Sequence, residues 1–172
     1  MEFLLCDYRD IPTTEKYDRI VSVGFMEHVG RFNFRTLYSV AEKVLVDDGI
    51  FLLHTMGNNR PDMPSTIKWF DTYIFPNSEM PPFVRLLADS EGLFYVEDIH
   101  TFGADYEKTL KAWEDNFDAG WPQIKDKYGE RFYRIWKTYL QTSQGVLGAR
   151  LYNVYQIVFS KKGIQGGYQS VR

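Results

Sequence analysis

Apolar and polar positions divide the first third of the chain into three elements. Residues 18–23 and 50–55 are rich in β-branched and aliphatic side chains and predict strands. Between them, residues 33–46 carry apolar side chains at helical spacing, and the Asp-Asp-Gly run at 47–49 is expected to end that helix. A strand, a helix and a strand joined by short links are typical of a parallel α/β sheet.

Further elements are expected on both sides of this unit. Strands are predicted at residues 2–6, 93–99 and 152–160. Helices are predicted at residues 83–90, 106–119 and 130–147. Pro122 is expected to open a helical stretch as a first-turn proline, and residues 163–172 are expected to form a loose end.

Residues 56–82 have a different composition, with many prolines, asparagines and aromatic side chains. A long aromatic-rich insertion after a strand end is uncommon unless it builds a binding surface. The alternative is that these aromatic side chains belong to the core, and this holds for part of them.

Glu27 and His28 follow the predicted strand 18–23 and lie between Gly24 and Gly30. In open α/β sheets ligands bind outside the carboxyl ends of strands, so this pair is a candidate for holding a polar ligand or moving a proton. The alternative is a solvated turn that places a carboxylate near a helix dipole.

His54 lies at the carboxyl end of the next predicted strand. If the two strands are neighbours, His54 lies near Glu27, and a carboxylate and an imidazole on two strand ends indicate a site. Taken alone, His54 is better explained as a core histidine bonded to a loop carbonyl, and the meeting of two strand ends is what favours a site.

Residues 102–106 follow a further strand. Gly103 lets the chain turn, and Tyr106 is a candidate to place a phenol in the same cleft. The alternative makes Asp105 a helix N-cap with Tyr106 packed beside it, while His100 is interpreted as structural.

Composition narrows the class of protein. The chain has 172 residues, 44% of them hydrophobic and 17% aromatic, which suits one folded domain rather than a disordered chain. A net charge of −3 argues against a nucleic-acid-binding protein. No apolar run approaches the ~20 residues of a membrane span. One cysteine, Cys6, excludes an internal disulfide and favours a reducing, cytosolic compartment.

Familiar chemical motifs are absent from the sequence. The three histidines have no metal-ligand spacing, so no metal site is predicted. No Gly-x-Gly-x-x-Gly loop, Gly-x-Ser-x-Gly elbow or Walker sequence occurs.

Several blocks of the sequence together resemble the cyclopropane-fatty-acyl-phospholipid synthases, in register and over essentially the whole chain. The blocks are residues 17–30 (YDRIVSVGFMEHVG), 49–57 (GIFLLHTMG), 73–77 (YIFPN), 102–106 (FGADY), 130–132 with 139–140, and 156–160 (QIVFS).

The resemblance implies an α/β, Rossmann-like fold of the class I S-adenosylmethionine-dependent methyltransferases. The implied reaction adds a methylene group across a cis double bond of a membrane phospholipid acyl chain, with bicarbonate as the base. By motif, Glu27, His54 and Tyr106 match the side chains that hold this ion, and Met56 matches the position that offers its backbone. Residues 56–92 and 104–150 are the implied acceptor-site segments.

The resemblance also implies that Asp7, Tyr8 and Gly24 lie on the cofactor side. The protein is expected to be cytoplasmic, peripheral at the inner membrane surface, and a homo-oligomer, most simply a dimer.

The sequence departs from the family in two places. Ser143 occupies the place of a family cysteine in the catalytic set, which makes a nucleophilic role for that position doubtful. The chain also begins after the family's first strands and glycine-rich cofactor loop. The domain is therefore expected to be an incomplete, C-terminal portion in which residues 2–6 form an unpaired strand, inactive and weak in cofactor binding by itself.

Two other hypotheses remain open at this point. One is a non-catalytic α/β binding or dimerisation module, and the other is a related transferase that acts on a different lipid or a small amine.

Overall fold

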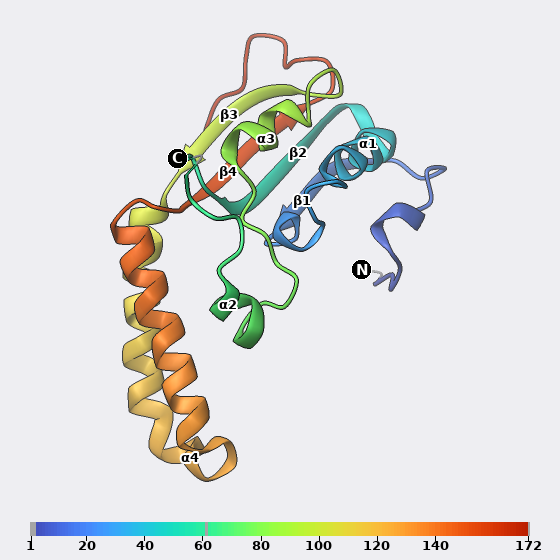
Figure 1. Ribbon diagram of the computed structural model, residues 1–172. Coiled ribbons are helices and arrows are strands. Elements are labelled where there is room, and N and C mark those ends of the chain that lie inside the picture. Colours follow the sequence, from blue (N-terminus) through green and yellow to red (C-terminus); the bar gives the residue numbers. More distant parts are fainter. Residues whose placement is uncertain (1–2, 61, 172) are drawn as a thin grey trace.

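A computed structural model describes residues 3–60 and 62–171 of the chain. Its four described strands form one sheet in the order β1-β2-β4-β3 (Figure 1). The strands are β1 (Tyr17–Val23), β2 (Leu45–Gly57), β3 (Tyr95–Thr101) and β4 (Asn153–Ser160). β1 and β2 are parallel, while β4 runs antiparallel to both of its neighbours. The α/β expectation is confirmed, and the sheet is mixed rather than wholly parallel.

Helix α1 (Phe34–Val44) ends earlier than the sequence predicted, and the prediction that residues 47–49 stop it is wrong. Leu45 already has extended backbone angles, and β2 runs through 47–49. The register explains how: Tyr17 pairs with Leu45, whereas Arg19 pairs with Ile50, so extra residues of β2 bulge between two points of contact with β1.

The main core lies between α1 and the sheet. The helix buries one face, including Leu37, Tyr38 and Ala41, as its periodicity predicted. The Tyr38 ring packs edge-on against Phe159 at 5.5 Å, and its hydroxyl donates to the Leu86 carbonyl at 2.7 Å. Full burial of such a side chain stabilises the fold by ~1.5–3 kcal/mol.

The strand predicted at residues 2–6 is wrong for the described part of it. Residues 3–6 have no regular structure, and Phe3 is 85% exposed. Residues 1–2 lie outside the described part of the chain. The chain then enters the short 3₁₀ turn Tyr8–Asp10, which the Asp7 carboxylate caps by accepting from the Arg9 amide at 2.9 Å. The first strand to join the sheet is β1.

β1 forms one edge of the described sheet. Among the described strands it pairs only with β2. Val21 and Val23 are exposed on it. An open strand edge with apolar side chains favours association, which keeps the expected dimer a prediction to be tested.

Two short helices interrupt the segments between strands. They are α2 (Lys68–Tyr73) and α3 (Phe83–Ala88). The helix predicted at 83–90 is therefore confirmed. The described part of the aromatic-rich insertion 56–82 contains the end of β2 and the helix α2. Residues 163–171 follow β4 without helix or strand.

Helix α4 (Gly103–Gly148) projects from one end of the sheet as a helical hairpin (Figure 1). Its two arms meet at Gly129, whose φ of 72° and ψ of 166° are non-helical. The sequence placed the new helix at Pro122, which is wrong because the first arm continues through this proline to Gly129. Asp105 is not the N-cap either: the helix begins at Gly103, so Asp105 lies in the first turn and pairs with Lys108.

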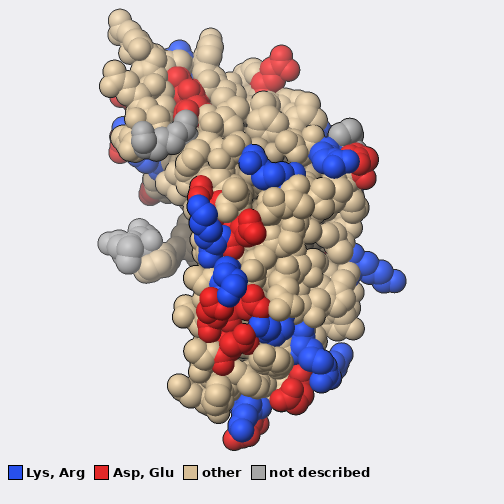
Figure 2. Space-filling view, turned by 90° about the vertical axis from the view of Figure 1, so that its left-hand side faces the viewer, with Lys and Arg blue, Asp and Glu red and all other residues tan. Residues whose placement is uncertain are grey.

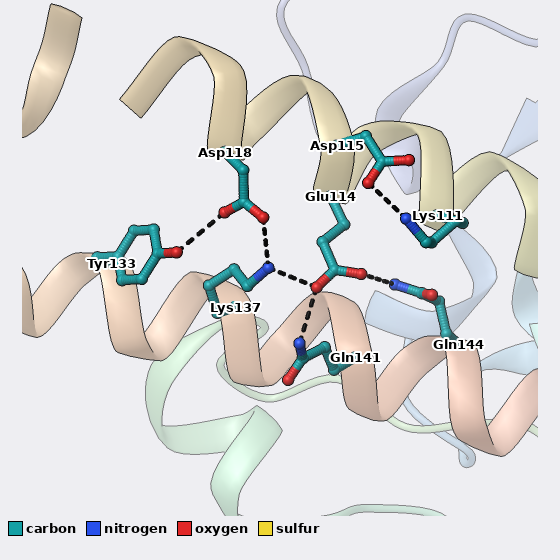
Figure 3. Close-up of polar contacts among 8 residues, drawn as sticks. All are labelled: Lys111, Glu114, Asp115, Asp118, Tyr133, Lys137, Gln141 and Gln144. Carbon is teal, nitrogen blue, oxygen red and sulfur yellow. Dashed lines mark hydrogen bonds and ion pairs between the residues drawn. The ribbon is translucent and has the colours of Figure 1, made fainter. Parts of the chain in front are cut away.

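A polar network joins the two arms of α4 (Figure 3). Lys137 Nζ on the second arm lies 2.5 Å from Glu114 Oε1 and 2.7 Å from Asp118 Oδ2 on the first. Gln141 and Gln144 donate to the two oxygens of Glu114 at 2.8 and 3.0 Å. These bonds, together with stacked aromatic rings such as Phe117 on Tyr133 at 5.5 Å, fix how the arms align.

Charged side chains of both signs lie next to one another along the face that α4 presents, with uncharged surface between them (Figure 2). No helix among the described residues is long and apolar enough to cross a bilayer.

Candidate active site

A cavity of about 230 Å³ lies where the carboxyl ends of β1 and β2 meet α4. Its walls come from these strand ends, from residues 65–80 and from both arms of α4. Most of the side chains in the wall are apolar or aromatic. The residues singled out from the sequence that line it are Gly24, Glu27, His28, His54, Met56, Tyr106 and Ser143.

Backbone contacts place Glu27 beside His54. Val23 pairs with His54 across the parallel strands, and the Gly24 amide donates to the His54 carbonyl at 3.0 Å. Gly24 has a φ of 61°, which glycine adopts without strain, and this turns the chain into the 3₁₀ turn Met26–His28. The predicted meeting of the two strand ends is therefore what the structure shows.

Glu27 is only 7% exposed, and its two carboxylate oxygens differ. Oε1 accepts from the Met56 amide at 2.7 Å. Oε2 is buried and has no hydrogen-bond partner within the described chain. A buried carboxylate oxygen without a partner is costly, so Oε2 is the atom of this cavity most in need of a donor.

His54 is held in one orientation from the neighbouring strand. Its Nδ1 lies 3.3 Å from Gln156 Nε2, an amide nitrogen that only donates, so Nδ1 accepts and Nε2 carries the proton. Burial lowers the pKa of His54, with the Glu27 carboxylate raising it in part. His54 is therefore a neutral imidazole at pH 7 with an N–H donor at Nε2.

The sequence reasoning missed Gln156. It pairs with His54 across β2 and β4 and with His100 across β3 and β4. The available signal was an amide side chain in the middle of the largely apolar strand 152–160. The strands that Gln156 lies beside follow from the order of strands in the sheet, which the sequence alone does not give.

Tyr106, in the first turn of α4, contributes a phenol to the cavity wall. Burial raises its pKa, and the Glu27 carboxylate raises it further, so the hydroxyl stays protonated and available as a donor. Burial likewise raises the pKa of the neighbouring Tyr139, with an added contribution from Tyr106.

The structure does not give the other predicted residues a clear role in the cavity. The Met56 amide is bonded to Glu27, so it is not free for a separate ligand. Ser143 is 7% exposed, and its hydroxyl has no hydrogen-bond partner among the described residues. Asp7 and Tyr8 lie outside the cavity, where Asp7 binds Arg9 and the Tyr8 ring packs edge-on against Phe25 at 5.6 Å.

No group of three His, Cys, Asp or Glu side chains suited to a metal ion occurs among the residues that the structure describes. His100 does not line the cavity; its ring lies 5.1 Å from that of Phe102.

The fold is that of the class I methyltransferases. A solved coclaurine N-methyltransferase matches 92% of this chain with a TM-score of 0.75 at 20% identity, which supports the fold alone. The cyclopropane synthase MmaA2 from Mycobacterium tuberculosis matches 92% of this chain and 59% of its own with a TM-score of 0.83 at 25% identity. Mycolic acid cyclopropane synthase CmaA1, complexed with SAH and CTAB, matches the same shares with a TM-score of 0.82 at 26% identity.

The chain belongs to the mycolic acid cyclopropane synthetase family, whose family model matches residues 1–157. It is 44% identical over 169 residues to the cyclopropane-fatty-acyl-phospholipid synthase of Escherichia coli K12, covering 98% of this chain and 43% of that protein. Sphingolipid C9-methyltransferase A of Emericella nidulans is 33% identical over 147 residues, or 81% of this chain and 28% of its own. The family resemblance is confirmed, and the chain spans less than half the length of these two relatives.

Proposed function

We propose that this chain forms the acceptor side of an S-adenosylmethionine-dependent cyclopropane synthase. The proposed reaction adds a methylene group across a cis double bond of a phospholipid acyl chain. The observation that carries the proposal is Glu27, whose buried Oε2 has no partner within the described chain, in a largely apolar cavity that two neutral donors, His54 and Tyr106, also line.

The walls of the cavity suit an acyl chain. Residues from the segments 56–92 and 104–150 supply most of the lining, as proposed for the acceptor site. The rings of Phe70 and Phe75 pack against Tyr139 at 6.0 and 5.7 Å. Aromatic faces stabilise positive charge, which this chemistry generates on the acyl carbons.

The carboxyl end of β1 suits the cofactor. A Cβ built on Gly24 meets no atom within 4 Å, so space is open beside this backbone at the strand end where such folds bind ligands. When bound, S-adenosylmethionine supplies a sulfonium methyl group to the alkene. Gly24 leaves room for the cofactor at this strand end. Asp7 and Tyr8 remain proposed contacts of the cofactor.

The polar end of the cavity suits a bicarbonate ion. When bound, this ion supplies the base that takes the proton lost on ring closure. Glu27 Oε2, which has no partner within the described chain, would accept a hydrogen bond from this ion, and the Tyr106 hydroxyl and His54 Nε2–H would donate to it. No Lys or Arg is among the described residues that line the cavity, so neutral donors hold the ion.

A lipid assay tests the proposed function. A full-length protein that contains this sequence is incubated with monounsaturated phospholipid, with and without S-adenosylmethionine, and the acyl chains are analysed by mass spectrometry. We expect a gain of one CH₂ per double bond that requires the cofactor. Methylation of a sphingolipid or an amine instead, or no transfer at all, contradicts the proposal.

We expect Ser143→Ala to have a mild effect on turnover, less than about threefold. The hydroxyl has no partner in the described chain, and serine lacks the thiolate that a covalent step would use. Turnover is measured in the same lipid assay. A loss as deep as that of a Glu27 variant contradicts this expectation.

A further inference from the structure

A shallow groove of about 210 Å³ lies between α2 and the second arm of α4, on the outer surface. It is lined by Trp69, Tyr73, Arg131, Arg134, Ile135 and Thr138. Both arginines and Tyr73 are exposed. The groove thus combines two cations, two amphipathic rings and an aliphatic side chain.

The polar groups of this groove are unused by the described chain. Arg131 and Arg134 form no ion pair or hydrogen bond with any described residue, nor do the Trp69 indole N–H and the Tyr73 hydroxyl. Some other arginines of the chain form ion pairs, including Arg31 with Glu79 and Arg85 with Asp89. Two like charges one helical turn apart repel each other, so an anion between them relieves an unfavourable contact.

One layer of aromatic rings separates the groove from the cavity. Trp69 lies on the groove side and contacts Phe70, which lines the cavity, with ring centroids 5.4 Å apart. Tyr73 packs against Trp69 at 5.6 Å. The groove and the acyl cavity therefore share a wall built by α2 and α4.

We infer that this groove binds the phosphodiester headgroup of a membrane phospholipid, an inference that rests on the proposed function. Arginine guanidinium groups bind phosphate oxygens with two parallel hydrogen bonds, and Trp and Tyr are favoured at the boundary between headgroups and acyl chains. Ile135 adds apolar surface that a lipid buries and a free phosphate does not. A phospholipid held here has its acyl chains beside the wall of the cavity.

Vesicle flotation tests the inference with the 172-residue chain. The double variant Arg131→Gln/Arg134→Gln is compared with wild type on vesicles of phosphatidylglycerol and on vesicles of digalactosyldiacylglycerol, which has no phosphate. We expect wild type to prefer the phosphate-containing vesicles, and the variant to bind them about tenfold or more weakly, since each Arg contributes substantially at an anionic surface. The phosphate-free vesicles bind both proteins alike.

The matched control is Arg19→Gln/Arg150→Gln, which removes the same charge from exposed arginines outside the groove. We expect this control to bind like wild type. Equal losses in the two double variants, or equal wild-type binding to both kinds of vesicle, overturn the inference.

A second measurement separates this inference from the proposed function. Fluorescence titration with cis-parinaric acid reports entry of an acyl chain into the cavity, and we expect the groove variant to bind it as wild type does. If the vesicle data fail and this binding persists, the headgroup site is wrong and the acyl cavity stands. Weak parinaric binding by wild type argues against the acyl cavity, and the flotation data still decide the groove.

Discussion

Changing Glu27 to glutamine, or His54 to alanine, lowers turnover by a factor on the order of 10² or more, the size expected when a positioned acid–base group is lost. The glutamine keeps the shape of Glu27 but replaces one carboxylate oxygen by an NH₂ group, so it no longer accepts at both positions. His54→Ala removes the N–H donor that Gln156 orients. The two variants are made at the matching positions of a full-length relative, and turnover is measured in the lipid assay.

Asp115→Asn is the matched control for the Glu27 change. Asp115 is an exposed carboxylate on α4 that forms an ion pair with Lys111, away from the cavity lining. We expect turnover close to wild type. Near-normal turnover in Glu27→Gln, or an equal loss in the control, removes the assignment of the site.

Lys137→Met destabilises the fold by about 2 kcal/mol, because it removes a charged hydrogen-bond donor from a carboxylate that is largely shielded from water. The change leaves the Glu114 carboxylate, 8% exposed, with only the two amides of Gln141 and Gln144. Urea unfolding followed by circular dichroism gives the free energy of unfolding. The control is Lys111→Met, which breaks an exposed pair with Asp115 and is expected to cost less than about 1 kcal/mol.

The pH dependence of the Lys137 effect follows from Glu114. Hydrogen bonding by Lys137, then by Gln144, lowers the pKa of Glu114 to about 2. A carboxylate whose pKa is lower in the folded state stabilises the fold fully above its unfolded value near 4.5 and loses this contribution as the pH falls towards 2. The difference between wild type and Lys137→Met therefore narrows across that window. A constant difference from pH 6 to pH 2 contradicts the role of this pair.

The core of the candidate site was predictable because it depends on local rules. Glu27 and His54 end two neighbouring parallel strands, and carboxyl ends of parallel strands meet at one edge of a sheet. Tyr106 follows Gly103, where α4 begins. Position along the chain and strand direction were enough to bring these three residues to one cavity.

The partners of these residues were not predictable, because they depend on the arrangement of elements distant in sequence. To predict the bond from the Met56 amide to Glu27, one must know how the turn after β1 folds back towards β2. To predict the contact of Gln156 with His54, one must know that β4 lies beside β2. To predict the groove that contains Arg131 and Arg134, one must likewise know how α2 packs on α4.

The errors in predicting the fold from the sequence share one cause, which is tertiary packing that overrides local signals. Residues 47–49 read as a helix stop but bulge within β2, where pairing with β1 resumes at Ile50. Pro122 reads as a helix start but lies within an arm whose rings and ion pairs hold it against the second arm. The apolar residues 3–6 read as a strand but have no strand beside them in the described chain.

A crystal structure with a brominated lipid tests the central claim, that the cavity beside Glu27 holds the acyl chain at its reacting carbons. Phosphatidylglycerol with 9,10-dibromostearoyl chains places two heavy atoms where the double bond of an oleoyl chain lies. We expect paired anomalous peaks inside the cavity, between His54, Tyr106 and Tyr139. Bromine peaks found only outside it, along the open edge of β1 for example, contradict the account.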